Sequence, residues 1–299
     1  MLKIREIKAK SIITESGLDV DYVINPYVGC LHSCIYCYSR FMKRFTNHHE
    51  PWGKFLDVKI NAAELIPKEN KKYKNKSIMI SSVTDPYQPA ERKYQLMRGI
   101  LEKLILLQPD LCLMTKSDLI TRDIDLLKQF KKCIAGVSLS LLDDKIRKEV
   151  EPFASPIERR INTVKELKKA GIRTFIFISP IFSYLTDWQG IIAKTKNYVD
   201  EFWFENLNLY PSLQYNIFQW LKNHHPELIK EYQKIYFTRN NYWDRAKKEI
   251  EIVARKTTSI LKSRPRWPRP SASTRAKFSP PPIKPASLRR RKDLVSARR

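Results

Sequence analysis

The chain alternates short apolar runs with amphipathic helical patterns between residues 22 and 206, and no other feature constrains its fold as strongly. The run at residues 172–178 is nearly all apolar, which is typical of a parallel strand covered on both faces. The six predicted strands are residues 23–24, 77–81, 111–115, 134–139, 172–178 and 201–206. Six strand-then-helix units in sequence predict a parallel α/β architecture, but they do not distinguish an open sheet from a barrel.

The helical segments between these strands have recognisable periods and ends. Residues 93–107 carry apolar side chains at the 3.6-residue spacing of an amphipathic helix. Ser155 is predicted to cap a helix that Pro156 begins and Gly171 ends. The remaining local predictions are short helices at 35–43 and 61–66 and an edge strand at Ile12-Ile13.

Three cysteines, Cys30, Cys34 and Cys37, follow the first predicted strand with the spacing Cys-x3-Cys-x2-Cys. Thiolates are soft ligands that hold iron–sulfur clusters or zinc. A cubane [4Fe–4S] cluster held by three thiolates leaves one iron open to a ligand from outside the protein. The alternative is a structural zinc held by these cysteines and His32, although such sites usually have four ligands in two separated pairs.

The sequence Cys-x3-Cys-x-aromatic-Cys, with Tyr36 in the aromatic position, resembles the signature of the radical S-adenosylmethionine (radical SAM) superfamily. The flanking residues 25–40 resemble more narrowly its spore-photoproduct-lyase-like branch. The resemblance implies a partial, six-stranded (β/α) barrel of TIM type, a [4Fe–4S] cluster and S-adenosylmethionine (SAM). It also implies an enzyme in which an electron from the cluster cleaves SAM, and the resulting 5′-deoxyadenosyl radical abstracts hydrogen from a substrate.

In a barrel of this type the reactive groups gather at the carboxyl ends of the strands. Ser82, Thr84 and Asp85 follow the second predicted strand, where many superfamily members carry Gly-Gly-Glu. The sequence Ser-Ser-Val-Thr-Asp departs from that pattern but is similar to the photoproduct-lyase branch. Hydroxyls and a carboxylate can accept hydrogen bonds from an ammonium group, so these three residues are the predicted ligands of the SAM amino group.

Further cofactor-binding residues are predicted from the same rule. Lys116 follows the third strand and can pair with the SAM carboxylate as a point charge. Ser138 and Ser140 end the fourth strand and can hydrogen-bond the ribose or methionine part of SAM. Tyr36 is expected to flank the adenine or the cluster.

Other parts of the resemblance leave questions open. The positions Arg122-Asp123, Glu151-Pro152 and Arg159-Arg160 also resemble the branch, but the sequence does not separate helix-terminal salt bridges from functional roles there. The photoproduct lyase is known for a cysteine near the end of its second strand that returns a hydrogen atom to the product. Residues 80–84 contain no cysteine, and Cys112 and Cys133 are elsewhere, so the resemblance does not carry over the substrate.

Charge indicates an anionic partner. The 56 basic and 31 acidic residues give a formal net charge of +25. Residues 262–299 hold 13 of the basic residues and one acidic residue, so the rest of the chain keeps +13. DNA or RNA is the expected partner, because a basic body attracts nucleic acid non-specifically. An enzyme of this kind also implies a low-potential electron donor of the flavodoxin or ferredoxin type. The alternative function is a basic nucleic-acid-binding protein with structural zinc.

Composition divides the chain into three predicted parts, namely a barrel (1–210), a helical C-terminal extension (211–261) and a basic tail (262–299). The tail contains seven prolines and cannot bury enough apolar surface to fold, so it is predicted to be disordered. The aromatic residues of the extension are expected to pack against the barrel, a platform for stacking bases being the alternative. No apolar run approaches the roughly 18 residues that a membrane span needs, so a cytoplasmic location is expected.

Overall fold

The computed structural model describes residues 1–256 except residues 70 and 74. The predicted disordered tail, 262–299, and residues 257–261 of the predicted extension lie outside this part. In the described residues, seven strands form one sheet in the order β10-β9-β8-β7-β6-β3-β2. These strands are β2 (Ile13–Glu15), β3 (Tyr22–Ile24), β6 (Ser77–Ile80), β7 (Asp110–Thr115), β8 (Cys133–Ser138), β9 (Arg173–Ile181) and β10 (Glu201–Asn206).

All pairs in this sheet are parallel except the pair of β2 with β3 at the edge. Ile24 pairs with Ile80, and Ile80 pairs with Leu113. The carboxyl ends of the six parallel strands therefore lie along one edge of the sheet. The mixed α/β class and all six predicted strands are confirmed, because each strand carries the apolar run that the sequence shows.

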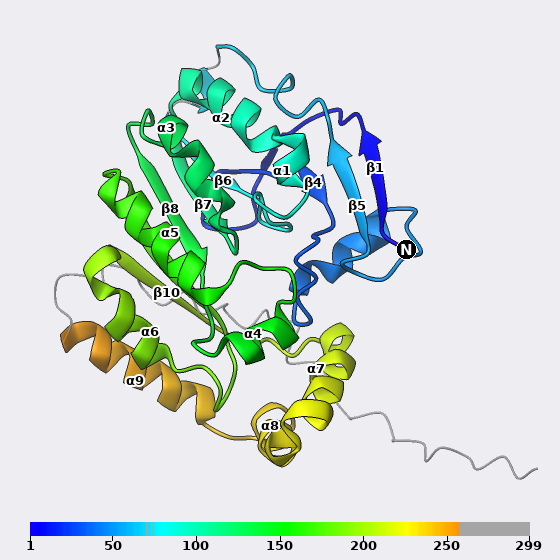
Figure 1. Ribbon diagram of the computed structural model, residues 1–299, viewed down its shortest axis with the longest axis vertical. Helices are drawn as coiled ribbons and strands as arrows, with labels where there is room; N and C mark the ends of the chain where they lie inside the picture. Colours follow the sequence, from blue (N-terminus) through cyan, green and yellow to red (C-terminus); the bar gives the residue numbers. More distant parts are fainter. Residues whose placement is uncertain (70, 74, 257–299) are drawn as a thin grey trace, which may run out of the picture. The chain divides into compact units, whose positions relative to one another are not determined.

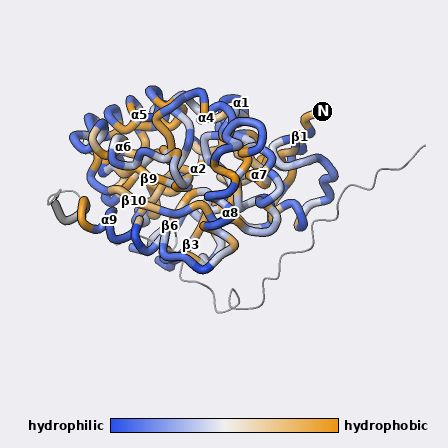
Figure 2. Tube along the Cα trace, turned by 90° about the horizontal axis from the view of Figure 1, so that it is seen from below, coloured by the Kyte–Doolittle hydropathy of each residue, from blue (hydrophilic) through white to orange (hydrophobic). Residues whose placement is uncertain are grey.

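Helices cover one face of the sheet, as Figure 1 shows for α2, α3, α5 and α6. The helices of this part are α1 (Glu91–Tyr94), α2 (Leu96–Leu107), α3 (Ile124–Leu127), α4 (Asp144–Val150), α5 (Ile157–Lys169) and α6 (Trp188–Thr195). Short 3-10 segments are η1 (Tyr38–Phe45), η2 (Lys71–Tyr73), η3 (Asp118–Asp123) and η4 (Lys196–Tyr198). Figure 2 shows hydrophobic residues gathered between helices and strands, with hydrophilic residues outside.

Helix α2 illustrates why the layers form. Met97, Ile100 and Leu104 are fully buried and lie in one core cluster with Ile78 and Leu113 of the sheet. Burying each such side chain contributes about 1.5–3 kcal/mol, which is why the 3.6-residue apolar period determines the face that packs.

A second, three-stranded sheet was not predicted. It pairs β1 (Lys3–Ile7) in parallel with β5 (Phe55–Lys59), and β5 in antiparallel with β4 (Tyr27–Val28). Strand β1 is mostly exposed and polar, and its partner lies about fifty residues away, so the local sequence pattern does not reveal the pairing. Because β4 directly precedes Gly29 and Cys30, this sheet positions the segment that leads into the three cysteines.

Two local predictions are wrong and one differs in detail. Residues 61–66 form turns rather than a helix, since Ala62 and Ile66 donate to the third residue before them. Ser155 does not cap α5; its hydroxyl donates to Asp118 at 2.5 Å, and Pro156 occupies the cap position. The helix predicted at 35–43 is the 3-10 segment η1.

The chain continues after the sheet with α7 (Pro211–His224), η5 (Pro226–Leu228), α8 (Ile229–Phe237) and α9 (Tyr242–Lys256). Trp220 and Tyr232 are buried in one cluster with Tyr36 and Phe182, so α7 and α8 pack against the cysteine segment. Tyr215, in contrast, is 73% exposed. Among the described residues, no helix is long and apolar enough to cross a membrane.

Candidate functional site

The three cysteines lie on a loop between β4 and η1, here called the Cys loop (residues 29–37). Gly29 has φ +94°, and a Cβ there would come within 2.6 Å of the Phe55 carbonyl oxygen, so only glycine fits this turn. All three thiols are free. In the described part of the chain, no three His, Cys, Asp or Glu side chains gather closely enough to hold a single metal ion.

Burial raises the pKa of each thiol, and that of Cys34 rises to about 12. Neighbouring thiols add to the rise in pKa at Cys30 and Cys34, whereas the charge of Lys116 lowers the pKa of Cys34 and Cys37. Thiolates form in such an environment only with a compensating positive charge, and binding to a metal supplies one. The donor set of three thiols, two buried and one partly buried, therefore fits an iron–sulfur cluster.

His32 lies on the Cys loop but does not face the thiols. Its Nδ1 is 3.0 Å from the carbonyl oxygen of Phe153, and its Nε2 is 3.3 Å from Asp85 Oδ2. Nδ1 therefore contacts a backbone oxygen, whereas Nε2 makes no hydrogen bond although Asp85 lies within ion-pair distance.

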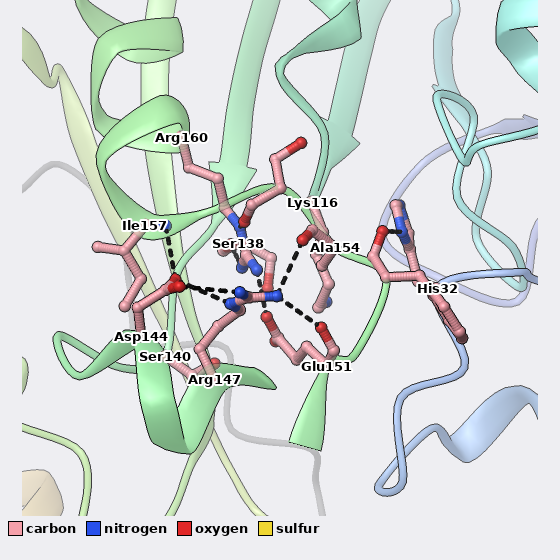
Figure 3. A network of polar contacts seen from close by, with 12 residues as sticks. His32, Lys116, Ser138, Ser140, Asp144, Arg147, Glu151, Ala154, Ile157 and Arg160 are labelled. Carbon is pink, nitrogen blue, oxygen red and sulfur yellow. Dashed lines mark hydrogen bonds and ion pairs between the residues drawn. The ribbon is translucent and has the colours of Figure 1, made fainter. Parts of the chain in front are cut away.

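Tyr36 connects the Cys loop to a buried ion pair. Its hydroxyl donates to Glu151 Oε1, and Glu151 Oε2 accepts from Arg160 Nη2 at 2.5 Å. Arg160 is fully buried and also donates to the carbonyl oxygen of Ser138, at the end of β8. Figure 3 shows Arg160, Glu151 and Arg147 gathered below the ends of the strands. The sequence did not separate a salt bridge from a functional role for Glu151 and Arg160. The tertiary structure pairs them and joins the pair to Tyr36.

Lys116 follows β7 and places its cation beside the Cys loop. Its Nζ is 5.8 Å from the centre of the Tyr36 ring. Burial opposes its charge, but Glu151, Cys34 and Asp85 outweigh burial and raise the pKa of Lys116. The lysine is therefore charged, and the predicted juxtaposition of this residue with the cysteines is present.

Asp85 is held at the end of β7 by contacts within the protein. Its carboxylate accepts from the Thr115 hydroxyl at 2.6 Å, the Lys116 amide at 2.8 Å and the Tyr87 amide at 2.9 Å. Although burial opposes ionisation, His32 and these donors lower the pKa of Asp85 to about 2. The carboxylate thus joins the segments after β6 and β7 to the Cys loop.

Thr84 and Ser82 also contact the cysteine segment. The Thr84 hydroxyl donates to the Gly29 carbonyl oxygen at 2.6 Å. The Ser82 carbonyl oxygen accepts from the hydroxyl of Tyr38, and the Ser82 hydroxyl accepts from Asn25 at 3.2 Å. Residues after β6 and residues around the cysteines are therefore joined by several hydrogen bonds.

Ser138 and Ser140 lie further along the same edge. Both hydroxyls donate to the carbonyl oxygen of Ser179, at 3.1 and 2.5 Å. The Ser179 hydroxyl in turn donates to Glu205 at the end of β10, and burial raises the pKa of Glu205. The structure therefore brings Thr84, Asp85 and Lys116 to the Cys loop and Ser82 to the residues flanking it, whereas Ser138 and Ser140 bond to β9.

A family model described as the radical SAM superfamily matches residues 24–189, which include the Cys loop and all strands from β6 to β9. An uncharacterised protein of Methanocaldococcus jannaschii is 40% identical over 227 residues, covering 76% of this chain and 85% of that protein. An uncharacterised protein of Mycobacterium tuberculosis is 28% identical over 251 residues, covering 77% of this chain and 73% of that protein.

Among solved structures, spore photoproduct lyase complexed with dinucleoside spore photoproduct is similar, with a TM-score of 0.61 and 15% identity. The match covers 85% of this chain and 78% of that chain. A mutant of the same enzyme with bound AdoMet and dinucleoside spore photoproduct gives the same TM-score at 14% identity and the same coverage. At such low identity, the likeness shows that the fold is shared.

Proposed function

This chain belongs to the radical SAM superfamily, and we propose that it cleaves SAM reductively and uses the resulting radical to abstract hydrogen from a nucleic acid. Enzymes of the superfamily use a [4Fe–4S] cluster and SAM and need a reductant. The observation that carries the proposal is the Cys loop, whose three thiols, buried at Cys30 and Cys34 and partly buried at Cys37, lie near Lys116 at the carboxyl edge of a parallel sheet. A low-potential donor of the flavodoxin or ferredoxin type is the proposed source of the electron.

Cys30, Cys34 and Cys37 are the proposed cluster ligands. The cluster, when bound, supplies the electron that breaks the sulfonium carbon–sulfur bond of SAM and so generates the 5′-deoxyadenosyl radical. Three protein ligands suit this chemistry because one iron stays open to the cofactor. The contact of His32 Nδ1 with the Phe153 carbonyl oxygen and the nearness of Nε2 to Asp85 support three protein ligands rather than four.

Lys116 and Tyr36 are proposed to contact SAM. The Lys116 ammonium is charged and lies next to Cys34, where it can pair with the cofactor carboxylate. The Tyr36 ring is buried, and its hydroxyl is held by Glu151, so it offers a fixed aromatic surface beside the Cys loop.

The other predicted SAM ligands are proposed to have two different roles. Thr84 and Asp85 already bond to the protein segments around the Cys loop, which supports a positioning role for both. The Ser82, Ser138 and Ser140 hydroxyls lie at the strand ends and are proposed to bind SAM through the lone pairs that their present bonds leave free.

A nucleic acid is the proposed substrate class because the chain is basic even without residues 262–299. The similar spore photoproduct lyase structures contain a dinucleoside photoproduct. The reaction on that substrate is not carried over, since Ser81 and Ser82 follow β6 where the lyase has its cysteine. Membership of the superfamily does not favour the zinc-binding alternative.

The test begins with anaerobic reconstitution of the full chain with iron and sulfide. About four irons per chain are expected, together with visible absorbance and formation of 5′-deoxyadenosine from SAM and dithionite. Cys34→Ala is expected to lose iron and product, whereas Cys133→Ala, which changes a thiol outside the Cys loop, is the matched control. Zinc at one ion per chain without iron, or a cluster that gives no 5′-deoxyadenosine, contradicts the proposed function.

A further inference from the structure

The Cys loop has a second side, where it contacts a surface aromatic residue. His32 lies between Cys30 and Cys34 in the sequence and is 2% exposed. Its Nδ1 is 3.0 Å from the Phe153 carbonyl oxygen, and the Phe153 amide donates back to the His32 carbonyl oxygen at 3.4 Å. The Phe153 residue is 55% exposed. A surface aromatic residue thus bonds directly to the proposed cluster-binding loop.

Three cationic side chains lie near Phe153. Lys54 Nζ lies 6.0 Å from the centre of the Phe153 ring. Arg92 of α1 and Arg159 of α5 line a cavity of about 210 Å³ together with Phe153 and His32. The two arginine side chains are 62% and 64% exposed. Lys54, Arg92, Phe153 and Arg159 are here called the Phe153 surface.

The charge of this surface is positive after its ion pairs are counted. Asp118 is the carboxylate that lines the cavity, 4.0 Å from Arg92 and 3.5 Å from Arg159. One carboxylate therefore faces two arginines, and Lys54 adds a third positive charge nearby. Exposed pairs at these distances are weak, so a partner with carboxylates can replace Asp118 at little cost.

The position of Lys54 depends on the Cys loop. Gly53 has φ +86°, and a Cβ there would lie 2.1 Å from the hydroxyl oxygen of Ser33, which belongs to the Cys loop. The segment that carries Lys54 is therefore packed directly on this loop. A partner bound to the Phe153 surface would contact segments that pack on the loop carrying the cysteines.

Adjacent residues after β7 contact the proposed SAM site and this surface. Lys116 extends toward the Tyr36 ring, whereas Ser117, the next residue, lines the cavity beside Arg92 and Arg159. Figure 3 shows Lys116 near Glu151 and His32 apart from that group of residues. A partner here would leave the strand ends free for cofactor and substrate.

We propose that the Phe153 surface is the docking site for an acidic one-electron carrier protein, which reduces the cluster through Phe153 and His32. This inference rests on the proposed function. An exposed apolar centre with a charged rim is typical of a transient protein interface, and opposite charge speeds the encounter. In the step, the reduced carrier loses one electron and the cluster gains it; no bond is formed or broken.

The test compares binding and reduction in the full chain. A reduced acidic flavodoxin is the probe, with its Kd measured by calorimetry on the chain without SAM. The Arg92→Glu/Arg159→Glu variant is expected to weaken Kd by about ten-fold or more, because each partner charge then meets repulsion. Cluster reduction by flavodoxin, followed by loss of visible absorbance, is expected to slow by a similar factor. The rate of cluster reduction by dithionite in the variant is expected to stay within about two-fold of the wild-type rate, because this small reductant needs no docking.

Lys169→Glu/Lys248→Glu is the matched control, because it makes the same change of net charge at exposed lysines on α5 and α9. This control is expected to keep most of the flavodoxin affinity. The milder Arg92→Gln/Arg159→Gln variant is expected to show a smaller loss in the same direction, and it keeps the test decisive if reversed charges disturb folding.

Three results overturn the docking site. The first is a wild-type chain that does not bind flavodoxin. The second is an equal loss of flavodoxin affinity in Arg92→Glu/Arg159→Glu and Lys169→Glu/Lys248→Glu. The third is an Arg92→Glu/Arg159→Glu variant that loses oligonucleotide affinity but keeps its flavodoxin affinity. The last result would assign the surface to nucleic acid. A different result would contradict the proposed function itself, namely that the wild-type chain forms no 5′-deoxyadenosine from SAM and dithionite.

Discussion

At the scale of single residues, Glu151 is where the Cys loop meets the helical layer. Its two carboxylate oxygens accept from Tyr36 of the loop and from Arg160 of α5. Burial raises its pKa, but Arg160, Lys116 and Tyr36 lower it below the usual range. Glu151 is therefore ionised, and its charge is compensated by groups that also define the proposed SAM site.

Replacing Glu151 with Gln should leave the buried Arg160 guanidinium without its counter-charge. Removing one partner of a buried ion pair costs about 3–5 kcal/mol of unfolding free energy. Urea denaturation of the purified chain measures this loss. Glu158→Gln is the control, since Glu158 is 71% exposed and pairs with Lys194 at 3.6 Å, where about 0–1 kcal/mol is expected. Equal losses in the two variants would contradict the importance of the buried pair.

Asp85 gives the site a defined response to acid. Its pKa is lowered to about 2 in the folded chain, against an ordinary value of 3.8. A group with a depressed pKa stabilises the fold above its unfolded pKa and loses that contribution as the pH falls from about 4 to about 2. The difference corresponds to about 2 kcal/mol.

Asp85→Asn should therefore be less sensitive to acid than the wild-type chain. Unfolding free energies at pH 6 and pH 3 are measured for both proteins. The wild-type value is expected to fall more steeply between these pH values, by about 1 kcal/mol of additional loss, since pH 3 lies within the titration window. Parallel pH profiles would show that Asp85 is not held by the donors described above.

At the scale of elements, the three-stranded sheet supports the Cys loop from outside the main sheet. Strand β5 is almost wholly buried, and Phe55 packs with Cys30 and Trp52. The turn before β5 contains Gly53, which contacts Ser33 of the loop. The loop is thus enclosed by β5 on one side and by the main sheet on the other.

Gly53→Ala should disturb the Cys loop through direct overlap. A Cβ at Gly53 would come within 2.9 Å of the Ser33 Cα, which is backbone and cannot move aside cheaply. The expected cost is above about 2 kcal/mol, with lower iron content after reconstitution. Gly171→Ala is the control, because Gly171 also has a positive φ, of +79°, but nothing lies within 4 Å of its added Cβ. If Gly171→Ala loses as much iron, the overlap is not the cause.

At the scale of the whole molecule, net charge is the feature that supports the proposed nucleic-acid substrate. The formal net charge is +25. The attraction between such a chain and a nucleic acid comes largely from release of counterions.

Binding of a single-stranded oligonucleotide to the full chain should therefore weaken steeply with salt. About four phosphate contacts are enough for a loss of at least about ten-fold in affinity between 50 and 200 mM salt. Fluorescence anisotropy with a labelled oligonucleotide measures this slope. An affinity that does not change over this range would remove the support that charge gives to a nucleic-acid substrate.

The sequence by itself determined the positions of the six parallel strands along the chain, the face that α2 buries and the three grouped cysteines. These features depend on local periodicity and spacing, which short-range sterics and apolar burial convert directly into structure. Ser82, Thr84, Asp85 and Lys116 were also predictable as neighbours, because the carboxyl ends of parallel strands share one edge.

The tertiary structure alone decided which polar groups pair. Three such contacts join segments that are separated in the sequence. They are the Glu151–Arg160 pair, the position of His32 between Phe153 and Asp85, and the contact of Gly53 with Ser33. It also decided that Ser155 bonds to Asp118 rather than capping α5. No local pattern encodes such contacts, because buried polar groups take the partners that packing brings within hydrogen-bond distance.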